Sequence, residues 1–173
     1  MLKPQSLFDH LSAAVPAFRA SPDQLSMLVR SGRIVAAGGP SLSFEYRYTV
    51  QLVALDFAGH PDAIMVPLLA WLRVNQPEVA DNPELRDKSV RFEAEYLNRQ
   101  AVDLSIEVDL TERVIVARRP AGPDPDPTTT FERWDIRHAG EPDRLGIAPL
   151  AEHWEIYDRD DLIATWDIAP ERV

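Results

Sequence analysis

The stretch that decides the fold is LSFEYRYTVQL, residues 42–52. Large apolar side chains stand at every second position with polar ones between them, which is the period of a β-strand. The pattern predicts a strand with one apolar face and one polar face. A strand of this length is typical of a curved or extended sheet. The apolar positions are Leu42, Phe44, Tyr46, Tyr48, Val50 and Leu52.

Two further alternating runs, residues 89–96 and 102–110, are joined by the polar residues 98–100. A short polar connection between two runs of period two predicts an antiparallel hairpin. After it, Thr-Glu-Arg at 111–113 is expected to turn the chain into a third antiparallel strand at residues 114–117.

The segment between residues 25 and 37 carries another turn signal. Residues 25–30 and 33–37 flank Ser31-Gly32, a pair of the kind that closes a two-residue hairpin. The glycine-rich run at 37–41 lacks the lysine of a phosphate-binding loop and leads into a strand, so a turn is expected there.

Two segments show helical spacing. Residues 4–19 begin with Pro4, which suits a first helical turn, and predict an amphipathic helix with a kink at Pro16. Residues 60–78, HPDAIMVPLLAWLRVNQPE, predict a helix that stops at 75–77 and is apolar around most of its circumference. Such a helix requires burial on two sides.

Neither a membrane span nor a secretory signal is expected. The uncharged window at residues 63–72 is well short of the roughly 18 apolar residues that a span requires. The start of the chain has no basic region followed by a long apolar run, so the protein is expected to begin in the cytoplasm.

Charge is distributed unevenly along the 173 residues, whose net charge is −10. Residues 1–119 carry 15 acids and 13 bases, whereas residues 120–173 carry 13 acids and 5 bases. This balance argues against a protein that grips phosphate backbones, because that role needs clustered lysine and arginine. The chain has no cysteine, which excludes disulfides and cysteine-based zinc sites.

The C-terminal third has its own pattern. PAGPDPDPTTT, residues 120–130, predicts an extended spacer. Residues 131–173 predict an acidic β arm, with a strand around Trp134 and a hairpin that turns at 158–161. The sequence as a whole predicts an α+β fold, a mostly antiparallel sheet with two helices packed on one face of a body at 1–119, plus this C-terminal β-hairpin arm.

Candidate catalytic chemistry is sparse. Asp56, His60 and Asp62 could be imagined as a metal or general-base site, which keeps a metal-dependent hydrolase as a remote alternative. A loop-to-helix junction explains them more simply, since an acid is favoured in a first helical turn. The acidic row on the strand at 102–110 could hold a cation, but a solvated sheet face is the simpler explanation. No G-x-S-x-G nucleophile motif is present.

Five segments, in their order and spacing, resemble the R-type tail completion protein of contractile-tailed bacteriophages. The segments are MLKPQSL (1–7), SLSFEYRYTV (41–50), DFAGHPD (56–62), VPLLAWLRVNQPE (66–78) and VDLTERVIV (108–116). The resemblance covers residues 1–119, and WEIYDRDDLIATWD near the end is similar to the family more weakly. Residues 131–150 do not match it.

The resemblance implies a non-enzymatic virion protein at the head-proximal end of the tail. Related tail terminators form a hexameric ring that caps the tail tube and prepares it for the head, on an α+β fold. The implied partners are other copies of the chain and the tail tube protein, with sheath and head-completion proteins left open. No catalytic residue, cofactor or metal is implied, and a head–tail adaptor is the alternative.

DNA is expected only to pass through the ring, because an acidic wall discourages a duplex from sticking. The candidate contact residues are aromatic or polar side chains at the ends of predicted elements, of the kind that dominates interfaces. They are Trp71, Arg73, Asn75, Gln76, Glu112, Arg113, Trp154 and Trp166.

Overall fold

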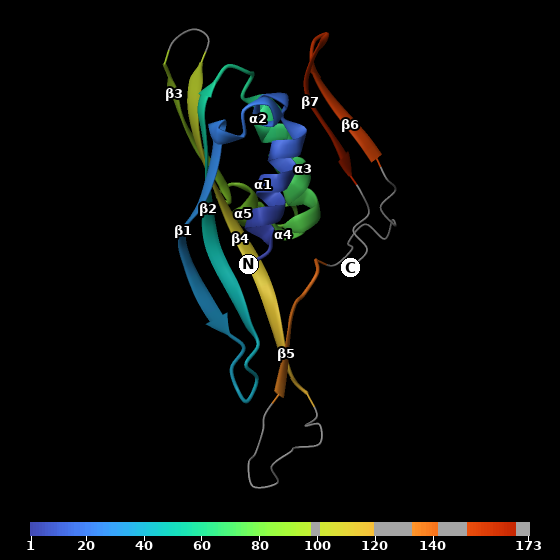
Figure 1. The fold of residues 1–173 in the computed structure, drawn as a ribbon. Helices are drawn as coiled ribbons and strands as arrows, with labels where there is room; N and C mark the ends of the chain where they lie inside the picture. The colour runs from blue at the N-terminus through green and yellow to red at the C-terminus, as the bar shows by residue number, and fades with distance from the viewer. Residues whose placement is uncertain (98–100, 120–132, 142–151, 169–173) are drawn as a thin grey trace.

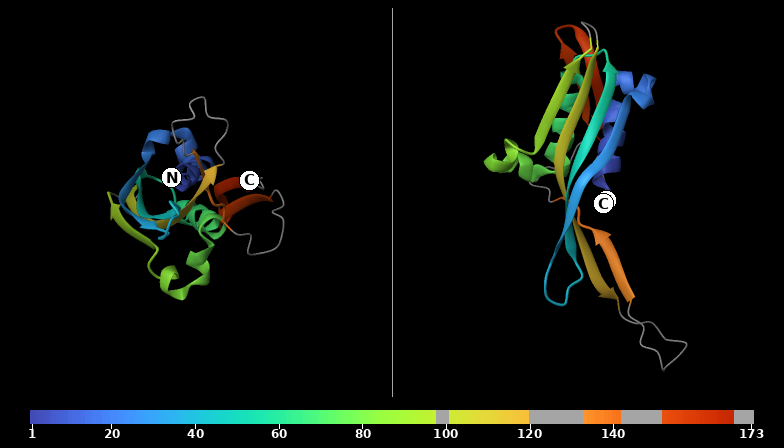
Figure 2. Two further views of the ribbon diagram at one scale, coloured as in Figure 1. Left: turned by 90° about the horizontal axis from the view of Figure 1, so that it is seen from below. Right: turned by 90° about the vertical axis from the view of Figure 1, so that its left-hand side faces the viewer.

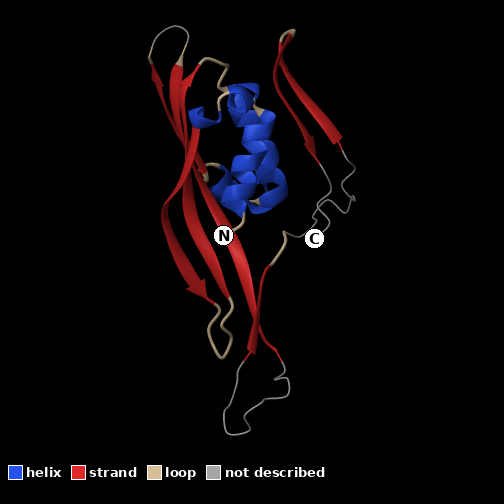
Figure 3. Ribbon diagram, viewed as in Figure 1, coloured by secondary structure: helices blue, strands red, loops and turns tan. Residues whose placement is uncertain are grey.

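The computed structural model describes residues 1–97, 101–119, 133–141 and 152–168, which form three layers. A long antiparallel sheet lies on one side, helices lie in the middle, and a separate β-hairpin lies on the other side (Figure 1, Figure 3). The predicted fold class, α+β with a mostly antiparallel sheet and a C-terminal hairpin, is confirmed. The predicted spacer at 120–130 lies outside the described residues.

The sheet is built around one strand, β4. Its strand order is β1-β2-β4-β3, and β5 also pairs with β4. Residues 102–108 of β4 pair with β3, and residues 114–119 pair with β5. Because β2 occupies the opposite edge of β4, β3 and β5 lie end to end along one edge. The bounds are β1 Leu25–Ala36, β2 Phe44–Phe57, β3 Val90–Tyr96, β4 Val102–Arg119 and β5 Arg133–His138.

The turn predicted at residues 111–113 is wrong, because β4 continues through it. Thr111, Glu112 and Arg113 pair with three consecutive residues of β2 and keep the register of the strand. The side chain of Glu112 points to the helical face, where it is buried and hydrogen-bonded. Residues 111–113 are polar and would favour a turn by themselves. Hydrogen-bond partners from distant parts of the chain hold them in the strand instead.

The hairpin predicted at Ser31-Gly32 is also wrong. β1 runs through this pair, with a shift of register between Val29 and Ser31. Gly32 lies opposite Tyr48, and a Cβ on Gly32 would come 3.2 Å from the Cβ of Tyr48. The glycine thus permits a close approach of two strands. The turn predicted at 37–41 is confirmed, with positive φ at Gly38 and Gly39.

The N-terminal helix is divided in two. Val15 has an extended backbone (φ −93°, ψ 115°) between the two pieces. Pro16 causes this break, since a proline disfavours the helical conformation of the residue before it. The kink predicted at Pro16 is therefore a complete interruption. The pieces are α1 Lys3–Ala14 and α2 Pro16–Ala20, followed by the short 3-10 turn η1 Pro22–Gln24.

The second predicted helix is confirmed as α3 Asp62–Asn75, which follows Pro61 and contains Pro67. The proline-rich segment after it forms two short helices, α4 Pro77–Asp81 and α5 Pro83–Arg86. None of the helices among the described residues has the length and apolar character needed to cross a membrane.

The core fills both spaces between the three layers. α1 and α3 pack on the sheet, and the hairpin of β6 Glu152–Asp158 and β7 Asp161–Ile168 packs on their other side. Trp166 of β7 is buried and meets His10 of α1 edge to face at 5.8 Å. The expected burial of α3 on two sides is confirmed, because α3 contacts both α1 and β7.

Candidate functional site

Glu112 lies at the point of β4 where the helical layer begins. Only 5% of the residue is exposed. Its carboxylate accepts hydrogen bonds from the amides of Leu2 (2.7 Å) and Lys3 (3.2 Å) and from the hydroxyl of Tyr48. The residue before α1 is a leucine, which offers no side-chain cap. Glu112 of the sheet therefore caps the start of the first helix.

The electrostatics of this carboxylate favour its charged form. Burial raises the pKa of Glu112, but the hydrogen bonds from Tyr48, Leu2 and Lys3 outweigh burial and hold the pKa below its usual value. Burial and the neighbouring carboxylate together raise the pKa of Tyr48 far above its usual value. Nδ1 of His138, on β5, lies 3.0 Å from Glu112 Oε2. Glu112 thus connects β4, β2, β5 and α1.

Gln76, at the C-terminal end of α3, makes a second set of buried hydrogen bonds. Its Oε1 accepts from Lys3 Nζ (2.8 Å) and from the backbone N–H of Thr111 (3.2 Å). Its Nε2 donates to Thr111 Oγ1 (2.8 Å) and to Glu78. Lys3 also forms an ion pair with Glu141 at 2.6 Å.

Gln76 fills the gap between β3 and β5 on the edge of β4. Three backbone groups follow one another along this edge of β4. The N–H of Asp109 donates to Ser89 O (2.9 Å), just before β3. The N–H of Thr111 donates to the Gln76 side chain, and the carbonyl of Arg113 accepts from the N–H of Ala139 (2.9 Å), just after β5. A side chain thus replaces a strand at this position, which keeps the backbone of β4 satisfied. We refer to Lys3, Tyr48, Gln76, Glu78, Thr111, Glu112, His138 and Glu141 as the β4 polar cluster.

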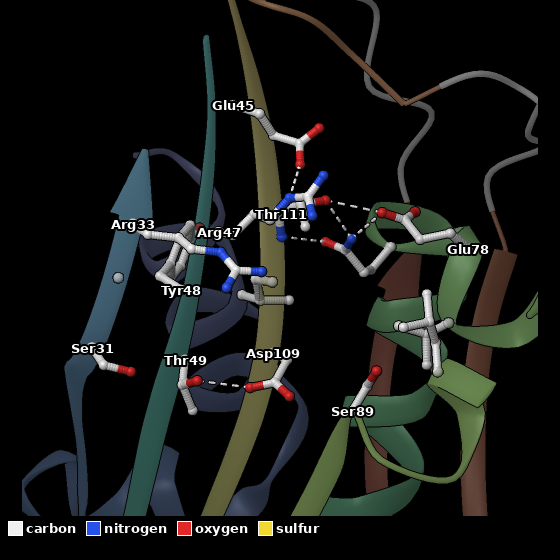
Figure 4. A pocket seen from close by; sticks show the side chains of 15 residues that line it. Ser31, Arg33, Glu45, Arg47, Tyr48, Thr49, Glu78, Ser89, Asp109 and Thr111 are labelled. Carbon is white, nitrogen blue, oxygen red and sulfur yellow. Dashed lines mark hydrogen bonds and ion pairs between the residues drawn. The ribbon is translucent and has the colours of Figure 1, made fainter. Parts of the chain in front are cut away.

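A shallow hollow of about 660 Å³ lies beside this cluster, between the sheet and α4–α5 (Figure 4). Four of its five charged side chains have partners: Arg47 binds Glu45, Glu78 accepts from Gln76, and Asp109 accepts from Thr49 Oγ1 at 2.7 Å. The fifth, Arg33, is exposed. None of its 15 lining residues is a histidine. The one hydroxyl beside a carboxylate, Thr49 beside Asp109, is a poor nucleophile–base pair, because Arg91 also binds Asp109 and its hydrogen bond helps to lower the pKa of that carboxyl.

The structure divides the predicted contact residues of α3 between core and surface. Trp71 is 4% exposed, and its Nε1 donates to Ser6 Oγ at 3.1 Å. Asn75 is half-buried and donates from Nδ2 to Trp71 O, whereas Arg73 is exposed. Gln76 belongs to the β4 polar cluster. Trp71 and Gln76 are therefore already engaged within the chain, and Arg73 is available to a partner.

The other four contact residues divide in the same way. Arg113 is exposed on the face of β4 opposite the buried Glu112. Trp154, 38% exposed, stacks on the buried Trp166 with ring centres 5.7 Å apart. Whether any of the eight residues contacts a partner stays a prediction. Those with exposed side chains are Arg73, Arg113 and Trp154.

The residues of the hydrolase alternative lie at the surface. His60 Nδ1 lies 3.3 Å from Asp62 Oδ2, with both side chains at least half exposed. Asp56 is exposed as well, and its backbone N–H donates to Asp103 Oδ1. Along the acidic row of β4, Asp109 is bound by Arg91 at 2.7 Å. Within the part of the chain that the structure describes, no group of three potential ligands could hold a metal ion.

Comparison with known proteins gives two matches. The family described as P2 phage tail completion protein R (GpR) matches residues 1–142. The chain is also 35% identical, over 167 residues, to tail completion protein R of Escherichia phage P2, an alignment that covers 96% of this chain and 99% of that protein. No solved structure matches the chain.

Proposed function

Since this chain belongs to the P2 phage tail completion protein R family, we propose that it completes the head-proximal end of a phage tail as a ring of six copies. The family is structural, so the chain is a tail protein of the virion and not an enzyme. In the proposed role the ring caps the tail tube and prepares the tail for joining to the head. The tube protein is its first partner.

One observation supports self-association most directly. The sheet continues well beyond the helices, and its far end has exposed apolar side chains, Ile34 and Ile136, that no other layer of the described residues covers (Figure 1). Exposed apolar surface of this kind marks protein contacts. A ring supplies that cover, because each copy meets a neighbour on either side.

The acidic end of the sheet is the surface that we assign to the channel. Glu93, Glu95 and Asp103 lie together on β3 and β4, on the face turned away from the helices. A wall with this charge repels DNA phosphates, so that a duplex passes without binding. A ring whose channel wall is rich in arginine would contradict this placement.

The test is deletion of the gene in the phage that encodes the chain, followed by electron microscopy of the lysate. We expect tails with irregular or over-long tubes that fail to join heads, and rescue by the wild-type chain. Native mass spectrometry of the purified chain tests the six copies. Normal tails after deletion would rule out tail completion, and binding to heads but not to tubes would favour a head–tail adaptor.

A further inference from the structure

The far end of the sheet is a distinct surface, which we call the sheet extension. It consists of residues 33–36 of β1, 44–47 of β2, 113–119 of β4 and 133–138 of β5. The helices begin at the level of Glu112, which binds the first residues of α1, and they cover only the other half of the sheet (Figure 1, Figure 2, right). Among the described residues, the helices leave most of the sheet extension uncovered: Val114, next to Glu112, is still buried, and the hollow beside α4–α5 borders Arg33 and Arg47.

One face of the sheet extension is apolar. The register places Ile34 beside Tyr46, Phe44 beside Val114, and Ile136 beside Val116, on the face that carries the helices further along. Ile34 and Ile136 are each more than 60% exposed. The core face of the sheet thus continues into solvent, which a soluble protein avoids unless the surface is used.

The opposite face is basic. Arg33 and Arg47 are direct neighbours across β1 and β2, and Arg113 and Arg137 follow on β4 and β5. All four side chains are exposed. The acids that the register places among them are Glu45, which pairs with Arg47, and Asp135. This excess of positive charge stands out in a chain of net charge −10.

The β6–β7 hairpin has the complementary character. Its exposed acids outnumber its one arginine, Arg159. Between the acids lie exposed apolar side chains, Trp154, Tyr157 and Leu162. The hairpin lies on the other side of the helices from the sheet (Figure 1). Its exposed acids are Glu155, Asp158, Asp160, Asp161 and Asp167.

We propose that the sheet extension of one copy binds the β6–β7 hairpin of the next copy. The proposal rests on the proposed function, since it names the contact that would join neighbours in the ring. Arginine guanidinium groups form paired hydrogen bonds with carboxylates, and the exposed apolar residues on both surfaces supply the buried area. The two surfaces differ and lie on opposite sides of the molecule, so the contact repeats head to tail from copy to copy, which is the kind of contact that builds a ring when the rotation between neighbours closes.

A second copy fits the arginine face better than a nucleic acid does. A duplex that lay along this face of the sheet would also meet the acids of β3–β4, Glu93, Glu95 and Asp103, which repel phosphates. A second copy brings a dense set of carboxylates together with apolar side chains. Such complementarity guides the correct pairing of surfaces.

Charge reversal tests the contact in the full chain. Arg113→Glu with Arg137→Glu reverses the sheet extension, and Asp160→Lys with Asp161→Lys reverses the hairpin. We expect each double variant to sediment as a monomer at concentrations where the wild type assembles, with self-association weakened at least about tenfold. All four changes in one chain, or a mixture of the two double variants, restore assembly because opposite charges then face each other again.

Arg19→Glu is the matched control, because Arg19 is an exposed arginine of α2 outside both surfaces. It should leave assembly unchanged. Circular dichroism checks that every variant is folded. Assembly of both double variants at the wild-type level would overturn the proposal, and so would a quadruple variant that stays monomeric although folded.

The absence of cysteine allows a second measurement. Ala117→Cys places a thiol on the sheet extension, and Asp160→Cys places one on the hairpin. A chain with both should form a ladder of disulfide-linked oligomers on oxidation, while a mixture of the single variants forms heterodimers. Homodimers alone from the mixture would overturn the contact, and so would a double-cysteine chain that gives no ladder when the wild type also stays monomeric at about 1 mM.

The outcomes separate this contact from the proposed function. A folded monomeric variant that still completes tails overturns the contact but not tail completion. An assembling wild type whose deletion leaves tails normal overturns tail completion but not the contact. Binding of a short duplex DNA that the Arg113→Glu/Arg137→Glu variant loses, with its assembly unchanged, would assign the arginine face to nucleic acid instead.

Discussion

The two halves of β4 have the same alternating pattern, but the cover over their apolar face ends just beyond Glu112, where Val114 is still buried. Residues 102–110 place their apolar side chains under α1 and α3, whereas beyond Glu112 the same face enters the sheet extension (Figure 2). Ile106 is 1% exposed in the first half, and Ile136, on the strand beside the second half, is 69% exposed. Alternation in a sequence therefore determines which face of a strand is apolar, but not what covers that face.

The largest expected difference comes from the same substitution in each half. Ile106→Ala removes buried methyl groups and leaves a cavity, so it should lower the free energy of unfolding by about 2–5 kcal/mol. Ile136→Ala should lower it by less than about 0.5 kcal/mol in the monomer. Urea unfolding of dilute protein measures both values. Similar losses at the two sites would mean that the sheet extension is packed within the single chain.

The border between the halves is tested at Glu112. Glu112→Gln keeps the shape of the side chain but removes the charge that accepts the amides of Leu2 and Lys3. We expect a loss of about 1–3 kcal/mol in the free energy of unfolding. Glu93→Gln, at an exposed position of β3, is the control and should change stability by less than about 0.5 kcal/mol. Equal effects of the two substitutions would refute the capping role.

Acid should weaken the attachment of α1 to β4 at Glu112, and so lower the free energy of unfolding. The pKa of Glu112 in the folded chain lies below the ordinary value of 4.5, and that of Asp109 is lowered as well. Protons therefore bind more readily to the unfolded chain, so this stabilisation is complete above the ordinary pKa and is lost as pH falls through the lowered one. Unfolding measured from pH 7 to 3 should show a decline below about pH 4.5. Glu112→Gln should make that decline shallower, and an unchanged decline would place its origin elsewhere.

The smallest effect on stability is expected in the half of the sheet that the helices cover, on its solvent-exposed face. Arg91 lies 2.7 Å from Asp109 and 3.4 Å from Glu107, with side chains that are more than a third exposed. Exposed ion pairs contribute little, so Arg91→Ala should cost less than about 1 kcal/mol, and less still in high salt. A larger loss that persists in 1 M salt would show that Arg91 supports the β3–β4 pairing through packing.

The sequence predicted those elements whose patterns are local. Period-two runs predicted the β3–β4 hairpin and the middle of β2, and helical spacing with flanking prolines predicted α3. The errors occurred where a local turn signal competed with distant partners, at Gly32 opposite Tyr48 and at Thr111–Arg113 opposite β2. Glu112 occupies a position that continues the apolar alternation of β4, and this was the one signal that could have placed it on the buried face.

The candidate site was predicted only in part. Trp71, Gln76, Glu112 and Trp166 were singled out by residue type, yet their side chains are buried in the chain itself. Their partners come from distant segments: Ser6 for Trp71, and Leu2 for Glu112. No pattern in a single sequence reveals such pairs. The exposed surfaces of the sheet extension and the hairpin became visible only once the strand register was known.

The capping of α1 by Glu112 also affects the order of events during synthesis. Leu2 and Glu112 are separated by 110 residues. At the usual rates of translation the carboxylate follows the helix by roughly 5–20 s. A helix of 12 residues is marginal in water by itself. Although α1 is synthesised well before β4, it is therefore among the last parts to become stable, and until β4 arrives its apolar face is exposed to chaperones.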